Sequence, residues 1–457
     1  MAVYDLTPVD VPQVNTKYRT IKTKLPVPES LPIFEKLRRT EPKSMMGQPP
    51  IVWHSAEDFI VSDRWGNRWL DWSSGVLITN VGHNHPEVRK ALINIINQGL
   101  LSTYVFVHEQ RAELTEILQS LAPDPANFTV FLLSSGSEAT ENCIKLAKTY
   151  AMEKHGPRKR YFVSFNNAFH GRTMGAQLAG GMPKLKKWMG ESDKSFIQTP
   201  FPDGYKNTNQ SFDQFLQTLR DRNIQPDEVA GVMVESYQGI GPDFMPVEYA
   251  KKLESFCREH DIVLCVDEVQ AGFGRTGKMF CFQHYGITPD LIACGKGISS
   301  SLPLAAVIGR RDIQGLYAPG SMTSTHSGSP LPVAAALANL KVLLRDKLVE
   351  NAAAMGEILV SEIHRIQKKY PDVLGCAQGK GLVAGIQVVK PGTKEPNPEL
   401  AQRINVACFQ KGLLMFAPVG VGGECLKIAP PLTITEDALR ESIQVFEEAI
   451  DEVLNKG

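Results

Sequence analysis

An acid and a lysine stand at the ends of two successive apolar segments of this chain. The first segment, Ile262–Val266, is rich in β-branched residues and stops at Asp267, and the second, Leu291–Cys294, leads into a lysine between two glycines, Lys296. Apolar runs of this length predict strands buried on both faces of a parallel sheet. Ligands of such sheets bind beyond the carboxyl ends of the strands, so we expect Asp267 and Lys296 to face one crevice.

A lysine and a carboxylate are the pair that pyridoxal phosphate chemistry requires. The lysine forms a Schiff base with the cofactor, and the carboxylate keeps the pyridine nitrogen protonated so that the ring can accept electrons. Taken singly, Lys296 is compatible with a solvated loop residue and Asp267 with a helix cap. Their occurrence together with the two segments described next predicts pyridoxal phosphate as the cofactor.

The segment FLLSSGSEATENCIKLAK, residues 131–148, offers a site for a phosphate group. An apolar strand leads into Ser134, Ser135, Gly136 and Ser137, and an amphipathic helix follows. Small residues allow backbone N–H groups to approach an anion, and the N-terminus of the helix adds a favourable dipole. Read alone, the same residues are typical of an ordinary N-cap and turn.

A third segment, Phe169-His170-Gly171-Arg172-Thr173, follows a run with strand character, Tyr161–Phe165. An aromatic side chain at this point can stack on the pyridine ring of the cofactor. The alternative is a core phenylalanine beside a histidine whose hydrogen bonds are satisfied inside the fold.

These segments resemble the class III aminotransferases, fold-type I pyridoxal phosphate enzymes that include the 4-aminobutyrate, ornithine and ω-amino acid transaminases. The resemblance extends from about Trp65 onward and is carried by SSGSEA, FHGRT, DEVQAGFGRTG and PDLIACGKGISSSLPLAAVIG, in the family's order. It implies an α/β fold of type I, with a large domain that has a mostly parallel sheet flanked by helices. A small α+β domain is then built from both ends of the chain.

The resemblance also implies a role for each matched residue. Lys296 is the Schiff-base lysine, Asp267 the partner of the ring nitrogen, and Gln270 the contact of the ring hydroxyl. The remaining expected cofactor contacts are the phosphate-binding Ser135, Gly136 and Ser137, the stacking Phe169 with His170 beside it, Glu235, and Thr325 in STHSGSP, which matches a threonine that reaches the phosphate from the partner subunit. A homodimer or a dimer of dimers with shared active sites follows from that match.

Substrate recognition is where the chain departs from these relatives. In the 4-aminobutyrate and ornithine transaminases an arginine stands three residues before the PP pair, and in CLKIAPPLTIT that position is Lys427; no arginine lies between Arg403 and Arg440. Glu235 matches the glutamate with which that arginine pairs, although the usual following proline is Ser236 here. Lysine binds a carboxylate as a point charge rather than as a bidentate fork. The alternative is a solvated lysine on a strand.

The expected reaction moves an amino group from an ω-amino acid or amine to an oxo acid, pyruvate or 2-oxoglutarate. By resemblance, Val76 and Tyr104 shape an apolar part of the substrate pocket, beside Glu235 and Lys427. A class III lyase that eliminates ammonia or phosphate, or an amino-acid epimerase, stays open as the alternative. These enzymes share the same cofactor residues, so only the substrate pocket separates them.

Composition limits the remaining classes of function. The chain has 457 residues, 43% of them apolar, and a net charge of zero, which gives no electrostatic support to a nucleic-acid or membrane role. Eight scattered cysteines without a CxxC pair, and an N-terminus without the apolar core of a signal peptide, indicate a cytoplasmic protein. His83 and His85 in GHNHP have no third ligand nearby, so we expect no metal site.

The order of the predicted elements suggests three parts of the chain. Residues 1–72 form an N-terminal arm, irregular up to Pro50, and part of the small domain, with a hairpin that turns at Trp65-Gly66-Asn67. Residues 73–335 form the large domain, in which apolar strands alternate with helices. Residues 336–457 complete the small domain. The predicted helices are Arg111–Leu121, Tyr249–His260, Pro332–Leu344 and Glu436–Leu454.

Overall fold

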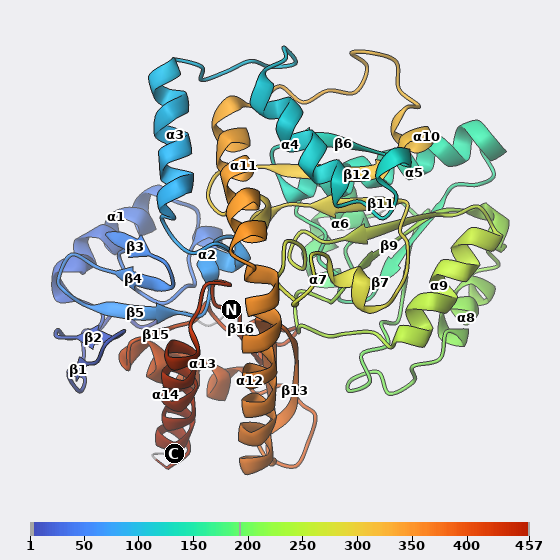
Figure 1. The fold of residues 1–457 in the computed structure, drawn as a ribbon. Coiled ribbons are helices and arrows are strands. Elements are labelled where there is room, and N and C mark those ends of the chain that lie inside the picture. Colours follow the sequence, from blue (N-terminus) through green and yellow to red (C-terminus); the bar gives the residue numbers. More distant parts are fainter. Residues whose placement is uncertain (1–3, 192, 456–457) are drawn as a thin grey trace. The chain divides into compact units, whose positions relative to one another are not determined.

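A computed structural model describes residues 4–191 and 193–455 (Figure 1). The chain divides into two compact units. One unit is formed by the residues up to His85 together with those from Glu350 onward, and the other is Pro86–Val349. The functional domains with bounds 1–72, 73–335 and 336–457 stay a prediction.

The unit Pro86–Val349 contains a seven-stranded sheet within its described residues. Its strands, in spatial order, are β6 (Phe128–Leu133), β12 (Ala305–Arg310), β11 (Leu291–Cys294), β10 (Val263–Asp267), β9 (Val229–Glu235), β7 (Tyr161–Phe165) and β8 (Phe196–Thr199). All pairs from β11 to β8 are parallel, whereas β12 is antiparallel to both of its neighbours. The predicted mostly parallel sheet is confirmed.

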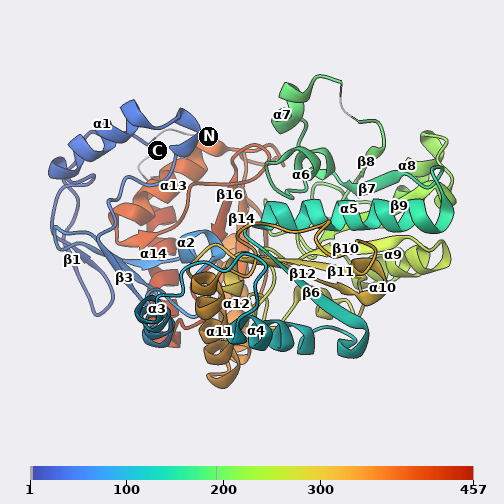
Figure 2. The same cartoon turned by 90° about the horizontal axis from the view of Figure 1, so that it is seen from above.

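The central strands are buried along their whole length, as their continuous apolar sequence predicts. Every residue of β9, β10 and β11 is buried. The helix α5 (Gly136–His155) packs across β9, β11 and β12, where its Cys143 shares a buried cluster with Cys265 (Figures 1 and 2). Because side chains alternate along a strand, Leu264 faces the opposite side of the sheet. Burial of each such apolar side chain stabilises the unit by about 1.5–3 kcal/mol.

The other helices of this unit are α3 (Pro86–Gln98), α4 (Glu109–Ser120), α6 (Met174–Ala179), α7 (Pro183–Lys186), α8 (Asp213–Asp221), α9 (Val247–Glu259), α10 (Arg311–Gln314) and α11 (Pro330–Arg345). Three of them, α4, α9 and α11, were predicted, and each begins two residues earlier than expected. The first turn of a helix makes few core contacts, so the apolar periodicity becomes visible only after it. The cap residues before them are His108, Pro246 and Ser329.

The other unit combines both ends of the chain. One sheet has the order β1 (Val14–Asn15), β2 (Thr20–Ile21), β5 (Arg68–Asp71), β4 (Ile60–Ser62) and β3 (Ser55–Glu57), with β15 (Leu413–Leu414) parallel to β5. A second sheet has the order β13 (Leu374–Lys380), β14 (Val383–Val388) and β16 (Cys425–Ile428). Its helices are α1 (Leu31–Thr40), α2 (Ser74–Leu77), α12 (Leu348–Lys369), α13 (Pro398–Gln410) and α14 (Glu436–Asn455).

Two expectations for this unit have different outcomes. The predicted hairpin is present, because β4 and β5 pair in antiparallel fashion around Trp65-Gly66-Asn67. The segment up to Pro50, expected to be irregular, contains the helix α1, none of whose residues is buried. An exposed helix of this kind lacks the core contacts by which a helix is usually recognised in a sequence.

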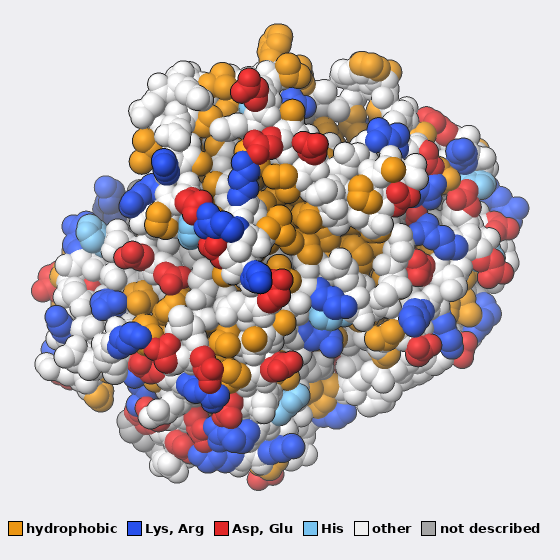
Figure 3. Space-filling view, in the orientation of Figure 1, with side chains coloured by type: hydrophobic (Ala, Val, Ile, Leu, Met, Phe, Trp, Pro, Cys, Tyr) orange, Lys and Arg blue, Asp and Glu red, His pale blue; other side chains and the backbone are white. Residues whose placement is uncertain are grey.

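The surface carries charges of both signs, in keeping with the zero net charge. Figure 3 shows Lys, Arg, Asp and Glu side chains interspersed over one face, with hydrophobic side chains gathered around its middle and smaller groups at its upper edge. The exposed apolar residues include Leu101, Phe106 and Val107, of which Val107 is 90% exposed, between α3 and α4. None of the helices in the described ranges is both long and apolar enough to cross a membrane.

Asp290, immediately before β11, ties together the strands that carry the two predicted catalytic residues. Its carboxylate accepts hydrogen bonds from Arg258 Nη1 at 2.5 Å, from Arg310 Nη1 at 2.9 Å and from Leu264 N at 2.8 Å. These donors belong to α9, β12 and β10. Asp290 is 1% exposed, so it depends on these partners to offset the loss of hydration.

Asp290→Ala is expected to lower the free energy of unfolding by about 3 kcal/mol, because two guanidinium groups and one buried N–H lose their acceptor. Urea unfolding followed by circular dichroism measures this change. The matched control is Asp312→Ala, which removes the partly exposed partner of Arg310 and should cost less than about 1 kcal/mol. Equal losses in the two variants would show that Asp290 is no anchor.

Candidate active site

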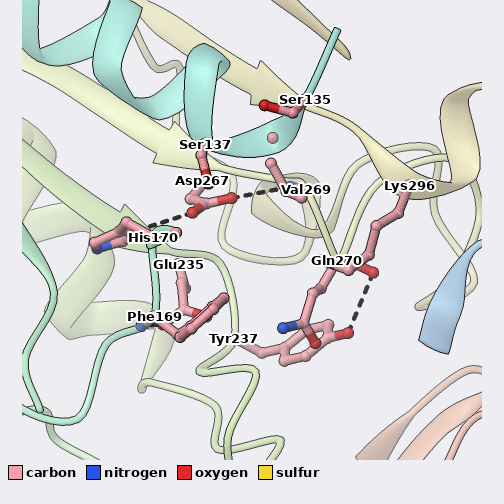
Figure 4. A pocket seen from close by; sticks show the side chains of 12 residues that line it. Ser135, Ser137, Phe169, His170, Glu235, Tyr237, Asp267, Val269, Gln270 and Lys296 are labelled. Carbon is pink, nitrogen blue, oxygen red and sulfur yellow. Dashed lines mark hydrogen bonds and ion pairs between the residues drawn. The ribbon is translucent and has the colours of Figure 1, made fainter. Parts of the chain in front are cut away.

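A cavity of about 170 Å³ lies at the carboxyl ends of β9, β10 and β11 (Figure 4). β9 ends at Glu235 and β10 ends at Asp267, and these two residues are paired in the parallel register. Lys296 follows β11 after a single glycine. The residues that line the cavity are Ser135, Gly136, Ser137, Phe169, His170, Gly171, Glu235, Tyr237, Asp267, Val269, Gln270 and Lys296.

Lys296 is presented to the cavity by a tight turn. Its φ angle is +43°, a left-handed conformation that is costly for a residue with a side chain and therefore has to be imposed by its surroundings. Asn339 of α11 supports the turn, because its Nδ2 donates to the carbonyl oxygens of Gly297 and Ile298, both at 2.9 Å. Burial lowers the pKa of Lys296, while the charges of Asp267 and Glu235 act in the opposite direction. A lowered pKa increases the fraction of neutral, nucleophilic amine.

Asp267 is paired with a buried histidine. His170 Nδ1 lies 2.8 Å from Asp267 Oδ2, and Val269 N donates to Asp267 Oδ1 at 3.0 Å. Burial alone would lower the pKa of His170, but the hydrogen bond to Asp267 and the charges of Asp267 and Glu235 outweigh it and raise this pKa. His170 Nε2 is buried and has no hydrogen-bond partner among the described residues. The pair presents a carboxylate to the cavity with an imidazole ring behind it.

Glu235 is held by two backbone amides. Phe169 N donates to Oε2 and Gly239 N to Oε1, both at 2.9 Å. Burial raises the pKa of Glu235 to about 7, and His170 and the two amides limit the shift. Near neutral pH this carboxyl group therefore exists in both protonation states, and it can respond to a charge brought by a ligand.

The N-terminus of α5 forms a narrow cradle on the cavity. Ser135 is the N-cap and forms a capping box with Glu138, whose Oε2 accepts from Ser135 N at 2.8 Å. A Cβ atom at Gly136 would lie 2.7 Å from Val269 Cγ1, so only glycine fits there. Gly171, at φ +131°, leaves no room for a Cβ beside the Ser137 hydroxyl. The free N–H groups of this first turn and the helix dipole suit an anion.

The structure brings most of the predicted cofactor residues together and adds three. Ser135, Gly136, Ser137, Phe169, His170, Glu235, Asp267, Gln270 and Lys296 all line the one cavity. Gly171, Tyr237 and Val269 line it too, and sequence reasoning did not single them out. Gly171 and Val269 are sequence neighbours of predicted residues, and Tyr237 is two residues from Glu235. Closeness to these motifs is the one feature of the sequence that could have identified them.

Four predicted residues do not line this cavity. Thr325 is exposed in a turn, and Tyr104 is 42% exposed, with its hydroxyl 3.1 Å from Thr323 Oγ1. Val76 and Lys427 belong to the other compact unit. Val76 is 48% exposed, whereas Lys427, on β16, is only 2% exposed, which argues against a solvated strand lysine. Their predicted roles in binding stay predictions.

The two histidines of GHNHP were not expected to bind a metal. His83 Nε2 lies 2.7 Å from Asp71 Oδ2, and both residues are buried. In the part of the chain that the structure describes, no group of three histidine, cysteine, aspartate or glutamate side chains is placed to hold a metal ion. The pairing with Asp71 gives His83 a role in the fold of its own unit.

Known proteins resemble this chain over nearly its whole length. The family model described as aminotransferase class-III matches residues 43–450. The 4-aminobutyrate aminotransferase of Mycobacterium leprae is 32% identical over 94% of this chain and 97% of that protein, and the isoleucine 2-epimerase of Lentilactobacillus buchneri is 33% identical over 85% and 87%. The crystal structure of a Bacillus anthracis aminotransferase superimposes with a TM-score of 0.84 at 28% identity, over 93% of this chain and 99% of that one.

The raised pKa of Glu235 predicts a pH-dependent stability. The folded chain holds the Glu235 proton up to about pH 7, whereas the ordinary value is 4.5, so this group stabilises the fold below about pH 4.5 and the contribution is lost as the pH rises through 7. Glu235→Gln cannot ionise. We expect the stability of this variant, relative to the natural chain, to rise by about 2–3 kcal/mol between pH 5 and pH 8.

Thermal unfolding of the ligand-free chain at several pH values measures this difference. The control is Glu395→Gln, because Glu395 is exposed and Lys390 lowers its pKa, so this carboxyl group titrates at lower pH than Glu235. The control should show a much smaller slope in this range. A flat difference for Glu235→Gln as well would mean that Glu235 is ionised throughout.

Proposed function

The chain belongs to the class-III aminotransferase family, and we propose that it moves an amino group from an ω-amino acid or amine to an oxo acid, with Lys296 and Asp267 as its catalytic residues. Pyridoxal phosphate is the cofactor of this family. The observation that carries the proposal is the meeting of a lysine amine, a buried carboxylate and a helix N-terminus at one cavity. These are the three groups that the cofactor's aldehyde, ring nitrogen and phosphate require.

The residues present fit this cofactor. The cradle at Gly136 and Gly171 is too tight for side chains and is lined by backbone N–H groups, as a phosphate requires. Phe169 offers an aromatic face on the same cavity, and Gln270 offers an amide. The Nε2 atom of His170 is buried and has no hydrogen-bond partner among the described residues. Buried polar atoms are usually paired, so we expect a further polar group beside His170.

The mechanism divides the work between these residues. When bound, pyridoxal phosphate supplies an electron sink for the pair released at the amine-bearing carbon of the substrate. Lys296 Nζ would hold the cofactor covalently and, once released as a free amine, would carry the proton that leaves the amine-bearing carbon of the substrate. Burial lowers the pKa of Lys296, which favours this role as a base. Asp267 would hold the ring nitrogen with its negative charge, and His170, 2.8 Å away, orients that carboxylate.

The substrate carboxylate is assigned to Lys427 and Glu235. Lys427 is 2% exposed, which distinguishes it from a solvated surface lysine. Glu235, which titrates near neutral pH, responds to the charge of the substrate. Val76 and Tyr104 supply apolar surface that selects by size. Pyruvate and 2-oxoglutarate are the proposed acceptors. Lysine binds a carboxylate as a point charge and not through two parallel hydrogen bonds, so Lys427 favours the monocarboxylate pyruvate over a dicarboxylate.

An amino-acid epimerase is the second candidate, favoured by the relative from Lentilactobacillus buchneri that is named isoleucine 2-epimerase. The same cavity residues serve either reaction, since both begin with loss of a proton from the amine-bearing carbon. The reactions differ in their products. A transaminase consumes an oxo acid, whereas an epimerase needs none.

We also propose a cytoplasmic homodimer or dimer of dimers in which Thr325 reaches the phosphate of the partner subunit. The exposed apolar segment around Leu101, Phe106 and Val107 supports this proposal, because burial in an interface would remove it from water. None of the eight cysteines forms a disulfide in the structure, which supports a reducing compartment. Sedimentation of the purified chain tests the assembly, and an active monomer would contradict it.

Lys296→Ala should abolish the covalent attachment of the cofactor and lower turnover by at least about 10³-fold, because no other amine among the described residues lines the cavity. Reduction with borohydride followed by peptide mass spectrometry should place the cofactor mass on Lys296 in the natural enzyme and leave the variant unlabelled. Lys341→Ala, at an exposed salt bridge with Glu113, is the control and should be labelled normally. Labelling of the Lys296→Ala protein would overturn the assignment.

The proposed reaction predicts a spectral change with an amino donor alone. On adding 4-aminobutyrate, the bound cofactor should convert to its amine form with loss of visible absorbance and release of one carbonyl product per site; pyruvate or 2-oxoglutarate should restore the spectrum. L-isoleucine tested in parallel distinguishes the second candidate. Conversion of L-isoleucine to D-allo-isoleucine without any oxo acid, and no conversion of the cofactor by any amine, would favour the epimerase.

A further inference from the structure

The turn after β9 holds the segment after β10 at three of its residues. Ser236 N donates to the carbonyl oxygen of Asp267 at 3.5 Å, and Ser236 Oγ donates to Glu268 Oε1. Tyr237 Oη donates to the carbonyl oxygen of Gln270 at 3.2 Å (Figure 4). The segment that carries both Asp267 and Gln270 is therefore fixed from one neighbouring turn.

The two side chains of this turn are themselves immobilised. Ser236 is 2% exposed and Tyr237 1% exposed. The Tyr237 ring packs against Phe244, with ring centroids 5.4 Å apart, and Tyr285 Oη donates to the Ser236 carbonyl oxygen at 2.5 Å. Buried side chains with fixed partners lose little further entropy when they hold another segment.

Glu268 explains why a hydroxyl is needed at position 236. Its carboxyl group is fully buried and accepts from Cys281 N and Phe282 N, both at 2.9 Å, in addition to Ser236 Oγ. Burial raises the pKa of Glu268 to about 7, and these three donors oppose the shift. A buried carboxyl group that loses a donor is destabilised, and its backbone is free to move toward other donors.

The side chain of Gln270 is bounded by the same turn. Gly239 lies directly beneath its amide, because a Cβ atom at position 239 would overlap Gln270 Nε2. Gly239 N also donates to Glu235 Oε1 at 2.9 Å. Thus one five-residue turn sets the carboxylate of Glu235 and both the carbonyl and the amide of Gln270 at the cavity.

We propose that Ser236 and Tyr237 are positioning residues that lock residues 267–270 so that Asp267 and Gln270 face the cofactor in one fixed geometry. The cofactor contacts of Asp267 and Gln270 rest on the proposed function. The hydrogen bonds from Ser236 and Tyr237 to residues 267–270, which we call the lock, do not depend on it.

Two variants test the lock one contact at a time. Tyr237→Phe removes only the hydroxyl that reaches Gln270, and Ser236→Ala only the one that reaches Glu268. In the ligand-free full chain, hydrogen exchange of the amides of residues 268–272 should be roughly 2- to 10-fold faster in each, the factor that corresponds to one lost hydrogen bond. The dissociation constant for pyridoxal phosphate should rise by a similar factor, and the pH titration of the bound cofactor's absorbance should shift.

Matched controls distinguish the effect of losing the lock from the general effect of removing a buried hydroxyl group. Tyr249→Phe removes a buried hydroxyl that has no hydrogen-bond partner among the described residues, and Ser164→Ala removes one that donates to the Ala179 carbonyl oxygen. Neither residue lines the cavity. Both controls should leave exchange at residues 268–272, the dissociation constant and the absorbance titration unchanged, even where overall stability falls.

The outcomes distinguish the lock from the proposed function. Unchanged exchange at residues 268–272 in both Tyr237→Phe and Ser236→Ala overturns the lock, whatever the enzyme does. Faster exchange with an unchanged cofactor affinity and absorbance titration overturns its positioning role. Failure of the natural chain to attach pyridoxal phosphate at Lys296 defeats the proposed function, while the exchange result still decides whether the lock exists.

Discussion

The structure depends on the parallel register of β9, β10 and β11, which brings ionisable groups to one edge of a sheet that cannot solvate them. Glu235 and Asp267 are direct register partners, and Lys296 follows the next strand. Apolar residues fill the sheet below them. Charges in such a place are tolerated only when each finds an opposite charge or a hydrogen-bond donor. The cavity is therefore a set of mutually dependent groups rather than a collection of independent ones.

The same burial acts in opposite directions on acids and bases. It raises the pKa of Glu235 and lowers that of Lys296, so both groups are drawn toward neutral pH from opposite sides. His170 is the exception, because its contact with Asp267 outweighs its burial and raises its pKa. Proton transfer near pH 7 needs an amine that is not permanently charged and a carboxylate whose position does not change. The strand register places Lys296 where burial lowers its pKa, and His170 holds the carboxylate of Asp267.

Close backbone approach gives the cavity its shape. Gly136 lies against Val269, and Gly171 against Ser137, so the N-terminus of α5 is pressed onto the end of β10. The turn after β9 completes the enclosure by holding residues 267–270 through Ser236 and Tyr237. A site bounded by closely packed backbone and by hydrogen bonds from buried side chains has few ways to rearrange.

The sequence by itself determined the strands that carry Asp267 and Lys296, since a continuous apolar run that ends in a polar residue is a local pattern. The bounds Leu291–Cys294 and Tyr161–Phe165 were predicted as they occur. The residues themselves also suggested a phosphate site at Ser134–Ser137 and a stacking aromatic at Phe169, and the family resemblance added Gln270. Only the tertiary structure decided that Tyr237 lines the cavity and that β12 runs antiparallel, because both depend on residues distant along the chain. A side chain's neighbours, and hence its pKa, are set by packing that no local pattern contains.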